Sequence, residues 1–207
     1  MKEILKNTII LFIITCIAGG LLGGVYSLTA NARKQTEEKA KNDAYRKVIN
    51  DAVSFEEIPV SNDISSYIES RNLSVSSVSI DEIVAGKDKD GNIPGYAITV
   101  TSKEGYGGNI TFTVGISSEG TINDISILTI NETAGLGMKA KEDDFLNQFK
   151  NKNVNLLHVV KSGAKTDDEI DAISSATITS NAMVNGVNTA ICTFEFITQD
   201  GGTDKNE

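Results

Sequence analysis

The chain has 207 residues and a formal net charge of −9, with a sequence pI near 4.7. This length is typical of one compact domain with an appendage, and the negative charge would repel a phosphate backbone, so no nucleic acid is expected as a partner. Cys16 lies in an apolar run and Cys192 near the far end, so a disulfide is implausible. The single histidine, His158, cannot build a zinc, haem or iron–sulfur site, so any redox chemistry requires an organic cofactor.

The first predicted element is a membrane-spanning helix over residues 8–28. This segment carries no charged residue, and about 20 apolar residues are enough for a helix to cross a bilayer. A cleaved signal peptide is the alternative, since Ala30, Asn31 and Ala32 form a small-x-small pattern, but its apolar region would span only about 7–15 residues. Basic residues flank both ends, so their count does not determine the orientation. Long domains translocate largely regardless of their charge, so the acidic domain that follows can lie outside the membrane. We therefore expect residues 1–7 in the cytoplasm.

Residues 29–74 are expected to form a stalk and a connecting segment. Within it, small apolar residues recur at helical spacing among many charges, namely Ala40, Ala44, Val48 and Ala52. This pattern is typical of an amphipathic helix, and we expect that helix to continue from the membrane.

The sequence changes character between about Val78 and Ile130, where runs of β-branched residues predominate. The dipeptides Asp90-Gly91 and Glu119-Gly120 punctuate these runs, and such pairs are typical of hairpin turns. We therefore predict a meander of about four antiparallel strands.

Helices and one further strand are predicted after the meander. Residues 142–150 indicate a short helix with acids in its first turn, where they complement the helix dipole, and residues 154–160 indicate a strand. After Ser180 an apolar stripe predicts a long helix packed on the sheet; its members are Met183, Val187, Ala190, Ile191 and Phe194. Residues 199–207 form a polar tail. The predicted fold class is α+β, an antiparallel sheet with packed helices over residues 75–198, preceded by one N-terminal transmembrane helix.

The segment directly before that last helix is the most informative part of the chain. Residues 171–180, DAISSATITS, are rich in small side chains and hydroxyls. Thr177 falls at or just before the helix start, where the first N–H groups have no intrahelical partners and the dipole favours negative charge. A phosphate attached to the Thr177 oxygen would be well placed there. The residues alone leave an alternative open, because Ser and Thr are also preferred N-caps without any ligand.

This segment resembles a known attachment signal. Its pattern is similar to Asp-x-x-Ser/Thr-Gly-Ala-Thr-x-Ser/Thr, the flavinylation motif of the FMN-binding domain in the G subunit of the Rnf electron-transport complex and the C subunit of the sodium-pumping NADH:quinone reductase. In that family the threonine after the alanine carries flavin mononucleotide (FMN) as a phosphoester, and the matching residue is Thr177. Ser175 stands where the family usually has glycine, so we expect a reduced tolerance for close approach by the attaching enzyme. The resemblance implies a flavin transferase that uses FAD and magnesium and reads Asp171.

Two further segments resemble loops of the same family. Residues 132–137, ETAGLG, are similar to its Glu-Thr-Pro-Gly-Leu-Gly loop beside the flavin ring. Ala134 replaces the proline, so a looser loop is expected. Residues 105–110, GYGGNI, resemble its Gly-Tyr-Gly-Gly segment between two strands. By composition alone the first could be a plain connection and Tyr106 could only brace a turn, because glycine allows unusual backbone angles in any loop.

The resemblance implies which residues bind the cofactor. Besides Thr177 they are Ser174, Ser175, Ala176, Thr179, Ser180, Glu132, Thr133, Gly135, Leu136, Gly137, Tyr106, Gly107 and Gly108. No catalytic residue and no metal ligand is implied. Thr177 is an attachment point, and the flavin transfers electrons while the protein supplies position, electrostatics and shielding.

The leading interpretation is an electron-carrying subunit of an Rnf-like ferredoxin:NAD oxidoreductase, coupled to Na⁺ or H⁺ translocation and not catalytic alone. The resemblance implies a single-pass protein of the cell (inner) membrane, with the FMN domain on the extracytoplasmic side and other membrane and peripheral subunits as partners. A covalent bond would prevent loss of FMN outside the cell, where no pool of it is maintained. Two alternatives stay open: a protein similar to the C subunit of the quinone reductase, and a membrane-anchored sensory or ligand-binding module that holds an anion reversibly.

Overall fold

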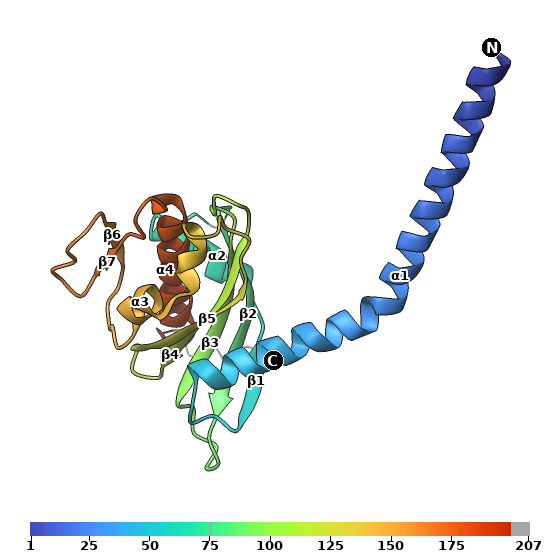
Figure 1. The fold of residues 1–207 in the computed structure, drawn as a ribbon. Helices are drawn as coiled ribbons and strands as arrows, with labels where there is room; N and C mark the ends of the chain where they lie inside the picture. The colour runs from blue at the N-terminus through green and yellow to red at the C-terminus, as the bar shows by residue number, and fades with distance from the viewer. Residues whose placement is uncertain (75, 200–207) are drawn as a thin grey trace. The chain divides into compact units, whose positions relative to one another are not determined.

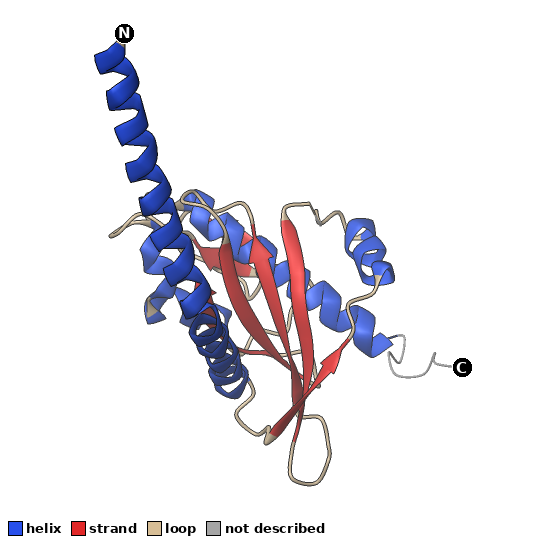
Figure 2. Cartoon of the chain, turned by 90° about the vertical axis from the view of Figure 1, so that its right-hand side faces the viewer, coloured by secondary structure: helices blue, strands red, loops and turns tan. Residues whose placement is uncertain are grey.

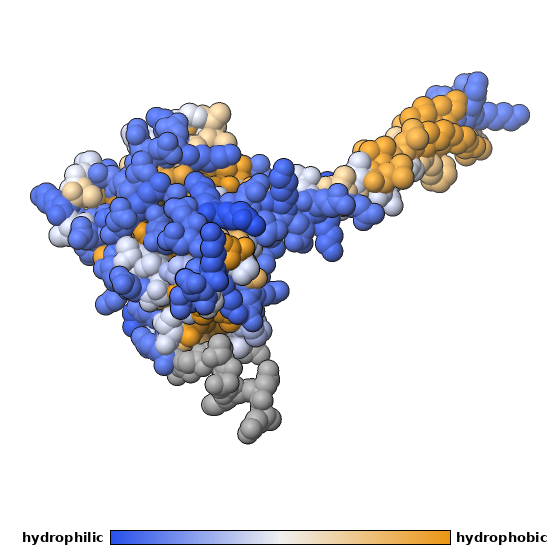
Figure 3. All heavy atoms as spheres, turned by 90° about the horizontal axis from the view of Figure 1, so that it is seen from below, coloured by the Kyte–Doolittle hydropathy of each residue, from blue (hydrophilic) through white to orange (hydrophobic). Residues whose placement is uncertain are grey.

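The N-terminal helix α1 (Lys2–Val48) is continuous in the structure, a computed structural model that describes residues 1–74 and 76–199. It contains a segment long and apolar enough to cross a membrane, and its apolar side chains are visible in Figure 3. The hydroxyls of Thr8, Thr15 and Thr29 each donate to a carbonyl three or four residues earlier, so they present no free donor to a lipid environment. The predicted long apolar N-terminal helix is therefore confirmed.

One antiparallel sheet forms the centre of the part of the chain that begins at Asn42. Its strands follow each other in sequence order: β1 (Ser54–Ile58), β2 (Val78–Lys87), β3 (Gly95–Ser102), β4 (Ile110–Ser117) and β5 (Ile122–Thr129). Strands β2 to β5 are the predicted meander (Figure 1). Strand β1 was not predicted, because its short sequence SFEEI carries two acids and little apolar pattern; its pairing with β2 supplies the ladder.

Helix α4 (Thr177–Gln199) covers one face of this sheet, as the apolar stripe predicted (Figure 2). It packs mainly on β3, and α2 (Asn62–Ser70) packs against α4 in turn. The core between helix and sheet contains Ile98, Phe112 and Val187, all fully buried. This packing fixes the N-terminal end of α4 relative to the loops that connect the strands.

The opposite face of the sheet is covered by the end of α1. Tyr45 and Val48 pack with Ile49 and Ala52 against β2 and β3. Alternate residues of a strand point to opposite faces of the sheet, so these two strands also present side chains to this second layer. Lys47 Nζ donates to the carbonyl of Ile125 at 3.2 Å. The compact unit that contains the sheet begins at Asn42. The second part of residues 29–74, which were expected as a stalk and a connection, therefore belongs to this unit.

The chain between β5 and α4 is less regular than predicted. It contains the 3₁₀ turns η1 (Gly137–Lys141) and η2 (Asn147–Phe149), the helix α3 (Asp143–Leu146), and the parallel pair β6 (His158–Val160) and β7 (Glu169–Asp171). The helix expected over residues 142–150 is thus split between α3 and η2. Of the strand expected over residues 154–160 only the last three residues form a ladder, because the Leu157 backbone is bonded to the side chain of Asn188 instead.

Candidate functional site

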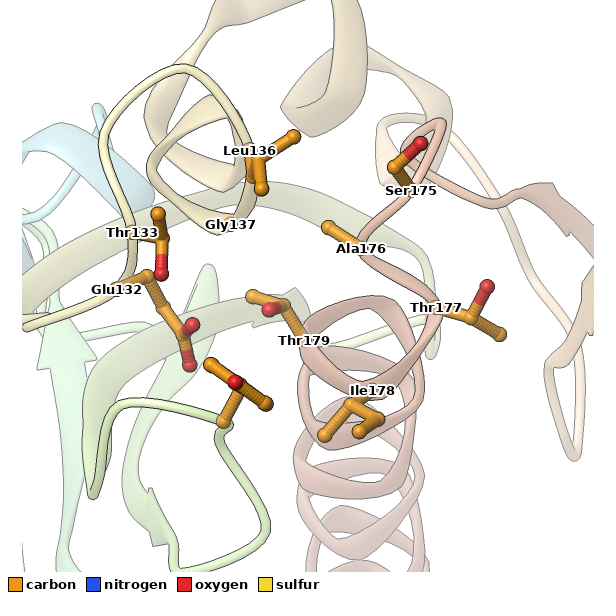
Figure 4. Close-up of a pocket in the computed structure, with 10 residues that line it drawn as sticks. Glu132, Thr133, Leu136, Gly137, Ser175, Ala176, Thr177, Ile178 and Thr179 are labelled. Carbon is orange, nitrogen blue, oxygen red and sulfur yellow. The ribbon is translucent and has the colours of Figure 1, made fainter.

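A pocket of about 520 Å³ lies at the N-terminal end of α4. Three segments line it: the loop after β3, the loop after β5 and the start of α4 (Figure 4). The lining residues are Tyr106, Glu132, Thr133, Leu136, Gly137, Ser175, Ala176, Thr177, Ile178 and Thr179. Sites for small molecules and cofactors usually have volumes of about 300–1,000 Å³, so the pocket has the size of a cofactor site.

Thr177 is the first residue of α4 and its side chain is exposed at the rim of the pocket. Figure 4 shows the side chain turned outward from the helix start. Within residues 1–74 and 76–199, the backbone N–H groups of Thr177, Ile178 and Thr179 have no hydrogen-bond partner. The first free N–H groups and the dipole of a 23-residue helix together favour an anion at this end.

The turn that leads into α4 holds Ser175 in the left-handed backbone region, with a φ of 63°. Glycine adopts this conformation without a steric penalty, whereas a residue with a Cβ atom is strained there. The left-handed turn therefore gives a physical reason why a glycine would suit this position.

Ser180 anchors the same turn from inside the protein. It is fully buried, its hydroxyl donates to the carbonyl of Ala176 at 3.0 Å, and its oxygen accepts the N–H of Ile173 at 2.9 Å. These bonds stabilise the entry into α4. Ser180 is therefore placed below the pocket, where it shapes the turn and does not line the cavity.

Asp171 and Ser174 lie beside the pocket, in a smaller hollow of about 210 Å³. The Asp171 carboxylate accepts the N–H of Ala164 at 2.9 Å, and its backbone N–H donates to Gln148 Oε1 at 2.7 Å. Asp171 thus holds the β6–β7 loop while its half-buried side chain remains next to the segment that carries Thr177.

Glu132 joins two of the three segments that line the pocket. Its Oε1 accepts the N–H of Gly107 at 3.2 Å, and the Glu132 side chain lies so close to Gly137 that a Cβ atom there would be 2.6 Å from Oε2. A Cβ atom on Gly107 would collide with the carbonyl of Asn131. The glycines of both loops are therefore required for close approach, which supports the expectation that these loops form one site.

Three apolar side chains form the exposed rim of the pocket. Tyr106 is 72% exposed, Ile178 53% and Leu136 40%. Large exposed apolar groups that meet at a cavity are typical of ligand and protein contacts. Ile178 was missed in the sequence, because the motif fixes no residue type there; an apolar residue in the first turn of a helix, off the buried stripe, was the available signal.

The structure brings most of the predicted site residues together. Those in the pocket are Tyr106, Glu132, Thr133, Leu136, Gly137, Ser175, Ala176, Thr177 and Thr179. Those that do not line it are Gly107, Gly108, Gly135, Ser174, Ser180 and Asp171. No basic side chain is among the lining residues, so an anion at the helix start would depend on backbone N–H groups.

Comparison with known proteins relates this site to flavin binding and electron transfer. Residues 105–192 match the family described as FMN-binding domain, and residues 1–48 match the RnfG N-terminal region. The first match contains the two loops and the start of α4.

Two relatives match almost the full chain. The G subunit of the proton-translocating ferredoxin:NAD(+) oxidoreductase complex of Clostridium ljungdahlii is 34% identical over 179 residues, which cover 86% of this chain and 85% of the relative. The G subunit of the Na(+)-translocating ferredoxin:NAD(+) oxidoreductase complex of Acetobacterium woodii is 31% identical over 196 residues, 94% and 93% of the two chains.

A solved structure shares the fold. The crystal structure of Shewanella oneidensis NqrC superimposes with a TM-score of 0.52 and 17% identity, covering 70% of this chain and 82% of that one. This likeness confirms the α+β fold class.

Proposed function

The chain belongs to the family of G subunits of ion-translocating ferredoxin:NAD(+) oxidoreductase complexes, and from this membership we propose that it carries electrons through an FMN bonded by its phosphate to Thr177. At the coarser level, it is an FMN-binding electron-transfer subunit of such a complex. It does not catalyse the overall reaction alone.

The observation that carries the proposal is the position of Thr177. Thr177 is the first residue of a long helix, and the first three N–H groups of that helix are free. The exposed Thr177 hydroxyl lies at the rim of a cofactor-sized pocket. A phosphate on that oxygen would receive hydrogen bonds from backbone N–H groups and a favourable dipole. This supports the phosphoester position without any basic side chain.

The rest of the pocket suits the ring system of FMN. Leu136, Tyr106 and Ile178 offer apolar surface, while Glu132 and Thr179 offer polar atoms deeper inside. When bound, FMN supplies the one- and two-electron chemistry that no side chain of this protein can supply. The chain's own residues would hold the ring, limit its contact with water and set its electrostatic environment.

Attachment of the phosphate requires a second protein. A threonine hydroxyl is a weak nucleophile that needs an adjacent base, and the pocket lining contains no histidine or lysine. We propose that a flavin transferase forms the bond and that Asp171, in the hollow next to Ser174, belongs to the surface it reads.

The membrane arrangement is the remaining part of the proposal. Helix α1 anchors the protein in the membrane with other subunits of the complex. We place the FMN domain on the extracytoplasmic side, where a covalent bond prevents loss of the cofactor. One relative is named as proton-translocating and the other as Na(+)-translocating, so coupling to either ion is compatible with membership of the family.

Intact-mass measurement tests the covalent bond. The full-length protein is co-expressed with a flavin transferase, denatured and freed of small molecules. A mass increase equal to FMN less one water is expected. Full release of flavin on denaturation would instead support the reversible ligand-binding module.

A further inference from the structure

Glu132 is the one charged side chain among the residues that line the pocket. It is only 9% exposed, and no ion pair to it is present in residues 1–74 and 76–199. Burial of a carboxylate without a counter-charge is costly unless hydrogen bonds compensate. A buried charge with so few partners in a cofactor-sized pocket points to an interaction with the ligand.

The two carboxylate oxygens of Glu132 have different surroundings. Oε1 accepts the N–H of Gly107 at 3.2 Å. Oε2 has no hydrogen-bond partner among the described residues; a Cβ atom on Gly137 would be 2.6 Å from it and 2.7 Å from the Thr179 hydroxyl oxygen. Figure 4 shows the Glu132 and Thr179 side chains pointing toward each other inside the pocket. One oxygen therefore positions the loop, and the other is free to accept from a ligand.

A carboxylate at this place has a definite electrostatic effect on a redox group. Reduction adds electrons, and a nearby fixed negative charge opposes that addition, more strongly in a partly dehydrated pocket than in water. The ring also carries an imide N–H in both its oxidised and its reduced form, a donor that suits the free Oε2. This hydrogen bond would hold the carboxylate near the ring, and the negative charge then favours the oxidised form.

We propose that Glu132 lowers the reduction potential of the bound flavin, and that it does so through its charge and not through the shape of the loop. This inference rests on the proposed function. Glu132 gives and takes no electrons; in a titration with dithionite, dithionite supplies two electrons per flavin, water supplies the protons, and Glu132 shifts the balance between the two forms.

The test compares Glu132→Gln with a matched control in the flavinylated full-length protein. Glutamine keeps the length and an acceptor for the Gly107 N–H but removes the charge. The control is Glu104→Gln, because Glu104 holds the same loop through Asn185 Nδ2 at 2.6 Å and does not line the pocket. Midpoint potential, flavin fluorescence and thermal unfolding are measured for each protein.

The expected result is at least a tenfold shift toward reduced flavin at a fixed potential in Glu132→Gln, which is about 30 mV for a two-electron couple. Glu104→Gln and Glu132→Asp should titrate close to the parent. An unchanged potential in a folded, flavinylated Glu132→Gln overturns the proposal, as does an equal rise in Glu132→Asp, since geometry would then be the cause.

A second substitution keeps the test decisive if Glu132→Gln does not take up flavin. Thr133→Lys brings a positive charge beside the carboxylate from an exposed position, and it should raise the potential more than Thr133→Gln does. Equal potentials in these two variants overturn the inference. Absence of covalent flavin in the parent would refute the proposed function instead, so the two failures are distinguishable.

Discussion

Asn188 and Leu157 are joined by two hydrogen bonds inside the fold. The Asn188 Oδ1 accepts the N–H of Leu157 at 2.7 Å, and its Nδ2 donates to the Leu157 carbonyl at 3.0 Å. Both residues are almost fully buried. The Asn188 side chain thus takes the place of a neighbouring strand: it satisfies the backbone hydrogen-bonding groups of Leu157, in the segment that leads into β6.

Asn188→Ala should therefore lower the free energy of unfolding by about 2–6 kcal/mol, because a buried N–H and a buried carbonyl lose their partners at about 1–3 kcal/mol each. Chemical unfolding of the full-length protein in detergent, followed by circular dichroism, measures the change. Asn181→Ala, at an exposed position of the same helix, should stay within about 0.5 kcal/mol of the parent. Equal losses in both variants would contradict the assignment.

Ser175→Gly should stabilise the protein, because Ser175 has a φ of 63° and glycine removes the steric cost of that conformation. The cost is about 1–2 kcal/mol and is partly offset by the greater flexibility of glycine when unfolded, so we expect a net gain of about 0.5–1 kcal/mol. Flavinylation by the transferase should be at least as fast as in the parent. A loss of stability in the same unfolding assay would show that the left-handed turn is not strained.

The thiol of Cys192 should be unreactive in the folded protein, because burial raises its pKa to about 11 and a thiol reacts as its thiolate. Folding favours the neutral thiol, so the free energy of unfolding depends on pH through Cys192. The stabilisation is complete below the pKa of an unfolded thiol, about 8.5, and it is lost as the pH rises toward 11. In a Cys16→Ser background, alkylation at pH 8 should require denaturant. Rapid alkylation without denaturant would show that the α4 core is open.

The proposed orientation predicts the labelling of single cysteines by an impermeant thiol reagent on whole cells. Lys89 is exposed in the β2–β3 turn and Asn7 is near the N-terminus. In the Cys16→Ser background, Lys89→Cys should react and Asn7→Cys should not. Labelling of Asn7→Cys alone would place the flavin domain in the cytoplasm.

The sequence predicted those parts of the fold that have a strong local pattern. The apolar stripe from Met183 to Phe194 indicated α4, and the β-branched runs indicated β2 to β5. Strand β1 and the packing of Val48 on the sheet could not be predicted, because both depend on partners distant in sequence.

The same distinction applies to the site. The motif identified Thr177 and its neighbours, but the left-handed backbone of Ser175 appears only in the folded turn. The approach of Glu132 to Gly137 and Thr179 also requires the tertiary structure, since the carboxylate and α4 come from different layers of the fold. Local chemistry was therefore predictable, whereas electrostatic partners were not.

Attachment is tested most directly by the substitution Thr177→Ala, with Ser118→Ala as the matched control, since Ser118 is an exposed serine outside the pocket and outside residues 171–180. Each full-length protein is co-expressed with a flavin transferase, and flavin fluorescence is read from the protein band on a denaturing gel. We expect fluorescent bands for the parent and Ser118→Ala and none for Thr177→Ala. A Thr177→Ala band as fluorescent as the parent would contradict attachment at this residue.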